Sequence, residues 1–222
     1  MSTVALLLAD SRFPAGGYAH SHGLEQAVSD GLGVDGVAPF IAARLRLVAR
    51  ADAALSVAAR RAAVAGNRDG QLARLDEEHA ARCPSPVLRQ TARRLGAQLL
   101  RSAATAWRCP TIEDYRATSC STPRPVALGV VGAAAGIDDH EVATIALYDD
   151  AATVSSAALK LLGLDPAEAA RWVAELAPQI DAVARAVVAD GRPLWEQPPP
   201  AAVGIELAAS IHAARKERFF AS

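Results

Sequence analysis

Charge of one sign, aromatic side chains and long hydrophobic runs are all scarce in this sequence. The 23 lysines and arginines nearly balance the 24 aspartates and glutamates, so no strong field attracts nucleic acid or an anionic membrane. The longest apolar run, residues 126–137, is too short to span a bilayer and suits a buried helix. Because no basic segment accompanies the short apolar stretch at the N-terminus, we expect no signal peptide and a cytoplasmic protein.

Cysteine and the motifs of common enzymes are equally sparse. Cys83, Cys109 and Cys120 form neither a CxxC pair nor a zinc-ligand pattern, and we expect reduced thiols. The sequence contains no P-loop, no GxSxG and no HExxH. Asp138 and Glu141 look catalytic, but acids at the start of a predicted helix interact favourably with its dipole. We therefore predict no catalytic residue, no cofactor and no enzyme.

The residues that are abundant favour helices. Apolar residues make up 51% of the chain and are mostly alanine, leucine and valine, of which alanine and leucine are strong helix formers. Apolar residues recur every three or four positions over residues 37–65, which predicts one long helix with its arginines on solvated faces. Residues 125–135 are apolar on all sides and predict a central buried helix, whose glycines allow close packing. Pro178 is expected to kink or split a helix over residues 167–189.

These segments together predict an all-α fold. Further helices are expected over residues 24–30, 71–81, 86–107 and 139–162, with shorter ones after residues 111 and 205. No segment shows the alternation of a β-strand. We predict one helical, bundle-like domain of about eight to ten helices over residues 1–222.

A dense loop, residues 10–23, is the first candidate functional segment, because loops rich in glycine, proline and polar residues often carry function. His20 and His22 in this loop could supply two ligands to nickel or zinc, with Asp10 and Glu25 as further candidates. Hydrogen bonding within the loop or contact with a partner is the simpler explanation of the two histidines. A tight metal site remains the alternative.

The C-terminal tail, residues 205–222, is the second candidate. Phe219 and Phe220 stand beside Arg218 close to the last residue, and this composition is typical of interface hot spots. The alternative is that both aromatic rings fold back on the core of their own chain. A cofactor-free helical enzyme is a further alternative, although no motif places a base and a nucleophile.

These same segments resemble one known family. Residues 6–25, LLLADSRFPAGGYAHSHGLE, are similar to the N-terminal signature of the UreF family, D-S-x-x-P-x-G-G-[FY]-x-x-S-x-G-L-E after an apolar stretch. Residues 93–100, RRLGAQLL, and 125–137, PVALGVVGAAAGI, resemble its arginine-rich middle helix and its buried apolar helix. His212 and the final RFFAS resemble its C-terminal ending. Residues 161–166, LLGLDP, lack the glutamines that many members carry there.

The resemblance implies an all-α homodimer that carries no active site. It implies an adaptor in the cytoplasm that bridges the GTPase UreG and the scaffold UreD/UreH on apo-urease (UreABC) during nickel insertion. The tail would engage UreD/UreH, and the dimer would present a site for UreG. A nickel-binding metallochaperone using His20 and His22 is the alternative. The residues expected to bind partners are Asp10, Pro14, Gly16, Gly17, Tyr18, His20, Ser21, Gly23, Glu25, His212, Arg218, Phe219, Phe220 and Ser222.

Overall fold

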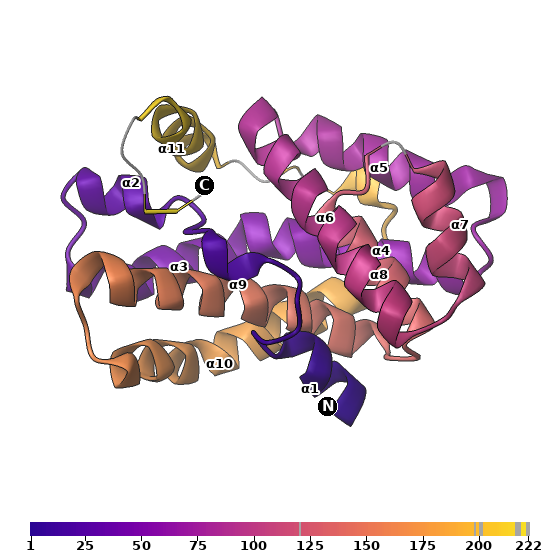
Figure 1. The fold of residues 1–222 in the computed structure, drawn as a ribbon, viewed down its shortest axis with the longest axis horizontal. Helices are drawn as coiled ribbons and strands as arrows, with labels where there is room; N and C mark the ends of the chain where they lie inside the picture. The colour runs from indigo at the N-terminus through magenta and orange to yellow at the C-terminus, as the bar shows by residue number, and fades with distance from the viewer. Residues whose placement is uncertain (120, 198, 200–201, 216–218, 221–222) are drawn as a thin grey trace.

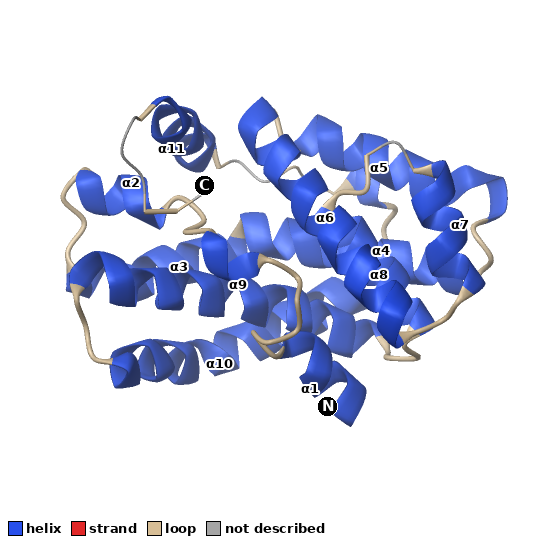
Figure 2. Cartoon of the chain, in the orientation of Figure 1, coloured by secondary structure: helices blue, strands red, loops and turns tan. Residues whose placement is uncertain are grey.

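The computed structural model describes the whole chain except residues 120, 198, 200–201, 216–218 and 221–222, and except the side chain of Tyr18. The described residues are helical or irregular and contain no β-strand, which confirms the predicted all-α class (Figure 2). The helices are α1 (Thr3–Ala9), α2 (Leu24–Ser29), α3 (Val37–Arg46), α4 (Val48–Val64), α5 (Gln71–Arg82), α6 (Pro86–Ala106), α7 (Pro110–Thr118), α8 (Arg124–Ala134), α9 (Asp139–Leu162), α10 (Pro166–Ala189) and α11 (Val203–Ala214).

Helix α4 lies at the centre and joins two halves of the core (Figure 1). Its Leu55 and Ala59 belong to an apolar cluster with α5, α6, α7 and α8. Its Ala53 and Val57 belong to a second cluster with α2, α3, α9 and α10. Burial of these two faces is what stabilises the arrangement of the helices around α4.

Helix α8 is the central buried helix that the sequence predicted. Residues from Pro125 to Gly132 are all buried, and α8 packs directly against α4. A Cβ atom on Gly129 would lie 2.2 Å from the backbone oxygen of Ser56 in α4. The absence of a side chain at Gly129 therefore allows the two helix backbones to approach so closely.

The predicted starts of two helices are also confirmed. Asp138 and Glu141 form a capping box at the start of α9, in which the Asp138 side chain accepts from the Glu141 backbone N–H. Ser85 caps α6 with its side chain, and Pro86 occupies the first turn. These acids and hydroxyls satisfy backbone donors at helix ends, as their positions in the sequence indicate.

Several predicted details are wrong. The helix predicted over residues 37–65 breaks at Leu47, whose φ of −112° and ψ of −91° are not helical. Arg44, predicted to be solvated, is buried, since an acidic partner on α9 reaches it. The short apolar stretch near the N-terminus, for which no structure was predicted, forms α1, capped by the Ser2 side chain.

Pro178 does not split α10, which runs as one helix from Pro166 to Ala189. Proline has no N–H, so the carbonyl of Ala174, four residues before Pro178, lacks its usual helical hydrogen-bond donor. Both Ala174 and Pro178 are exposed. Water can satisfy that carbonyl, so the helix continues. No helix in the described part of the chain combines the length and apolarity needed to cross a bilayer.

Candidate functional site

The first part of the loop over residues 10–23 is fastened to α6. The Pro14 carbonyl accepts hydrogen bonds from Ser102 Oγ at 2.8 Å and from Gln98 Nε2 at 3.3 Å. Asp10 stays within the loop: its hydrogen bond with the Arg12 side chain lowers the pKa of Asp10 to about 2. Gly16 uses the backbone freedom of glycine, because it has a φ of +84° at the start of a short 3-10 turn, η1 (Gly17–Ala19).

The second part of the loop turns into the molecule. Ser21 is fully buried, and its Oγ accepts the Glu25 backbone N–H at 3.4 Å, within the first turn of α2. Gly23 adopts a φ of +89° just before α2, a left-handed conformation that suits glycine. Gly17 is not among the glycines with a positive φ. Burial lowers the pKa of His20 to about 4, so its imidazole is neutral near pH 7.

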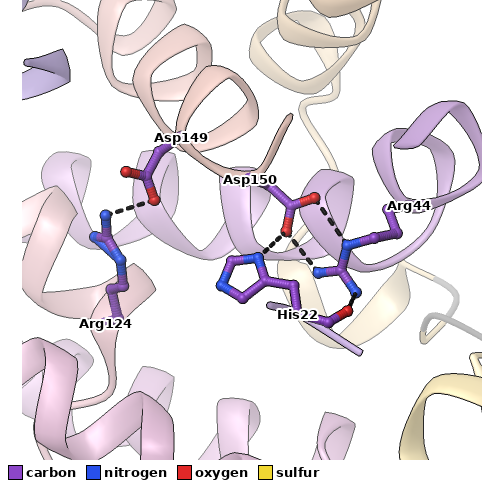
Figure 3. Close-up of polar contacts among 5 residues, drawn as sticks. All are labelled: His22, Arg44, Arg124, Asp149 and Asp150. Carbon is purple, nitrogen blue, oxygen red and sulfur yellow. Dashed lines mark hydrogen bonds and ion pairs between the residues drawn. The ribbon is translucent and has the colours of Figure 1, made fainter. Parts of the chain in front are cut away.

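His22 lies in a buried network of charged groups that the sequence did not reveal (Figure 3). Its Nδ1 lies 3.0 Å from Asp150 Oδ1, and its backbone carbonyl accepts from Arg44 Nη1 at 2.8 Å. Arg44 also donates to both oxygens of Asp150, at 2.5 Å and 3.0 Å. The φ of +52° at His22 is uncommon for a residue with a side chain, and these bonds hold it there.

The electrostatics of this network follow from burial and pairing. Burial alone would raise the pKa of Asp150, but the Arg44 guanidinium and the His22 ring hold the pKa of that carboxyl well below its usual range. The preceding residue of α9, Asp149, pairs with Arg124 of α8 at 2.7 Å (Figure 3). The loop, α3 and α8 are therefore each joined to α9 by hydrogen bonds or ion pairs that are at least partly shielded from water.

A cavity of about 160 Å³ lies beside this network, among residues of α3, α4, α6, α9 and α11. His22, Arg44 and Asp150 line it, together with Asp52 of α4. Burial and repulsion from Asp150 raise the pKa of Asp52 to about 7. Among the described residues, no hydrogen bond or ion pair reaches the Asp52 carboxyl, which explains why its ionisation is costly.

A second buried network fastens the C-terminal tail to α2. Glu25 is only 4% exposed, and its carboxylate accepts the backbone N–H of Phe219 at 2.8 Å and that of Phe220 at 3.1 Å. His212 Nε2 lies 2.8 Å from the same carboxylate. Burial alone would raise the pKa of Glu25, but the donors from Phe219, His212 and Phe220 lower it. We call these four residues the tail latch.

The two aromatic residues of the tail latch have opposite surroundings. Phe220 is 6% exposed, packs into the second apolar cluster and lies 5.3 Å below the ammonium of Lys160. Phe219 is 83% exposed. The alternative that both rings fold back on the core is therefore correct for Phe220 and wrong for Phe219.

The structure thus separates the residues predicted from sequence into groups. Glu25, His212, Phe219 and Phe220 meet in the tail latch, whereas Asp10 and Pro14 lie apart from it, along the loop towards α6. Arg218 and Ser222, and the side chain of Tyr18, lie outside the described residues.

Sequence reasoning missed the partners of His22. The available signal was an acidic pair, Asp149 and Asp150, inside the otherwise apolar middle of α9. Within the described residues, no group of three or more histidine, cysteine or acidic side chains is placed to hold a metal ion.

The model of the UreF family matches residues 33–177, most of the helical body. The chain belongs to the UreF family. The matched region holds Arg44, Arg124 and Asp150, while the tail latch lies outside it.

Individual members of the UreF family match more of the chain. A protein of Mycobacterium sp. (strain JLS) is 32% identical over 99% of this chain and 98% of its own length. One from Mycolicibacterium vanbaalenii is 35% identical over 80% of this chain and 82% of its own. One from Mycobacterium tuberculosis (strain H37Ra) is 33% identical, with 84% and 87% covered. Each is named urease accessory protein UreF, and UreF membership supports a role in urease maturation.

Proposed function

We propose that this chain is a non-catalytic adaptor for urease maturation. It bridges the GTPase UreG and UreD/UreH on apo-urease (UreABC), so that nickel is inserted into the urease active site. It works in the cytoplasm as a homodimer. It acts as one UreF-like helical domain, residues 1–222, with two contact segments: the loop over residues 10–23 and the tail over residues 205–222.

The observation that carries this proposal is the tail latch. It holds the backbone of Phe219 and Phe220 in place while leaving the Phe219 ring 83% exposed. Because its backbone is already held, Phe219 has less conformational entropy to lose on binding than a residue of a free tail, which favours a hot spot.

Helix α11 supports the same surface. Val203, Leu207 and Ile211 recur every four residues along α11 and are 78%, 59% and 45% exposed. Residues at this spacing share one face of a helix. An apolar helix face near an exposed phenylalanine is the composition expected of a protein interface. We assign this surface to UreD/UreH.

Size-exclusion chromatography with light scattering tests the proposal. The protein is mixed with UreG and UreD/UreH, with nucleotide and nickel present, and a complex containing two copies of this chain is expected. Phe219→Ala should weaken UreD/UreH binding, whereas Val64→Ala, at a site 63% exposed at the end of α4, should not. Absence of any association with UreG or UreD/UreH contradicts the adaptor function.

A nickel-binding metallochaperone is the second candidate, and one observation favours it. Asp150 engages Nδ1 of His22, an arrangement that orients the other ring nitrogen in many metal sites. The depressed pKa of His20 also keeps its ring in the neutral form that binds metals. Nickel titration of wild type and of the His20→Ala/His22→Ala variant decides: tight binding lost in the variant supports the metallochaperone.

A further inference from the structure

A second pocket, of about 430 Å³, lies where α3 meets α4, against the segment that follows α10. Four arginines and a single carboxylate line it: Arg46, Arg50, Arg82, Arg192 and Asp190. We call it the arginine pocket. The chain as a whole carries a net charge of only −1, so this is a local concentration of positive charge in a nearly neutral protein.

The break at Leu47 shapes the arginine pocket. Helix α3 ends at Arg46 and α4 begins at Val48, and the two arginines on either side of the break, Arg46 and Arg50, line the same pocket. Both are exposed, which is the ordinary position for an arginine. Their convergence on one concave surface is less ordinary, because like charges repel where they gather.

The charges of the pocket are only partly matched by the chain itself. Arg192 pairs with Asp190 at 2.7 Å, and Arg82 pairs with Glu78 at 2.5 Å. Arg82 is also held by the backbone carbonyl of Gln197 at 3.0 Å. Among the described residues, none forms a hydrogen bond or an ion pair with the guanidinium of Arg46 or Arg50. Arg46 and Arg50 therefore face the pocket without an ion-paired carboxylate of their own, although the charge of Arg50 acts on Asp190 across the pocket.

We propose that the arginine pocket binds an acidic segment of a partner protein through two or more of its carboxylates. A guanidinium presents paired N–H donors that match the two oxygens of a carboxylate. Trp195 follows the pocket-lining Leu194 and is 69% exposed, and arginine with tryptophan is a composition enriched in protein hot spots. This site is separate from the tail latch and does not depend on which partner binds there.

The charge distribution favours a polypeptide over nucleic acid. Nucleic-acid binding needs a basic stripe that follows several phosphates, whereas the arginine pocket is a single concave site with four arginines and one carboxylate. Free phosphate shares the chemistry of a carboxylate, but it would not use the exposed ring of Trp195. The occupant that fits all the observations is a short acidic peptide with an apolar or aromatic neighbour.

The test uses the full-length protein and a synthetic hexaglutamate peptide ending in tryptophan, with a fluorescein label. Binding is followed by fluorescence anisotropy at low salt. We expect saturable binding that is weakened roughly tenfold in Arg46→Gln/Arg50→Gln, because each exposed ion pair contributes modestly. The matched control is Arg68→Gln/Arg74→Gln, which removes the same charge from exposed positions outside the pocket. This control should bind as wild type does.

Three outcomes overturn the proposal. Equal weakening in the control variant shows attraction by net charge alone. Binding of inorganic phosphate or of a single-stranded oligonucleotide more tightly than the peptide assigns the pocket to another ligand. Unchanged affinity in Trp195→Ala, together with unchanged affinity in the double-arginine variant, places the peptide elsewhere. Circular dichroism of each variant confirms that the helices are intact before binding is compared.

Discussion

Replacement of Glu25 by alanine should release the C-terminal tail. Glu25 is the only acceptor in the described structure for the Phe219 and Phe220 amides, and it also pairs with His212. Removing one partner of a buried charged pair typically costs about 3–5 kcal/mol. An unsatisfied backbone donor adds about 1–3 kcal/mol unless the tail moves out into water. The tail can move, so we expect the lower value, about 3 kcal/mol, as lost docking energy of the tail.

Amide hydrogen exchange measures the docking energy of the tail directly, because the backbone amides of Phe219 and Phe220 are the groups that donate to Glu25. A loss of about 3 kcal/mol corresponds to roughly hundredfold faster exchange at Phe219 and Phe220. Glu175→Ala is the control, since Glu175 is 53% exposed and, among the described residues, pairs only with Arg171. Urease activation in a complemented strain should fall in Glu25→Ala and stay normal in the control.

Two results would refute the reasoning about Glu25. Unchanged exchange at Phe219 and Phe220 means that burial of the Phe220 ring alone holds the tail. Faster exchange throughout α2, α3 and α9 means that the variant destabilises the whole fold and not the tail. The lowered pKa of Glu25 also fixes the direction of the pH dependence. The stabilisation of the tail by Glu25 is present above the unfolded pKa of about 4.5 and is lost as the pH falls below it.

Three further predictions concern the buried network and the central helix. The raised pKa of Asp52, about 7, means that the folded state loses stability as the pH rises from about 4 to 7. The Asp52→Asn variant should therefore have a higher free energy of unfolding than wild type at pH 8 but not at pH 4. Thermal melts at the two pH values measure the difference. Asp150→Ala leaves Arg44 buried without its carboxylate and should cost about 3–5 kcal/mol in urea denaturation; a cost below about 1 kcal/mol would contradict the network's role. Gly129→Ala should destabilise by about 1–3 kcal/mol because its Cβ meets α4, whereas Gly191→Ala, in open space, should be near neutral by the same assay.

Much of the fold was predictable because its signals are local. The capping box of Asp138 and Glu141, the Ser85 cap and the all-apolar α8 are read from a few neighbouring residues, and each appears as expected. The break at Leu47 was not predictable, since the apolar period continues through it on both sides.

The residues of the candidate site also fall into two groups, those predictable from the sequence and those that only the tertiary structure reveals. The sequence alone determined the helical class, the caps, the buried glycine-containing helix and the resemblance that marks the loop and the tail. Only the tertiary structure decided that Phe220 is buried and Phe219 exposed, because adjacent residues in an irregular tail have no periodicity to distinguish them. Only the tertiary structure could show that Arg44 is buried, since its partner Asp150 lies 106 residues away and the ion pair exists only when α3 packs against α9.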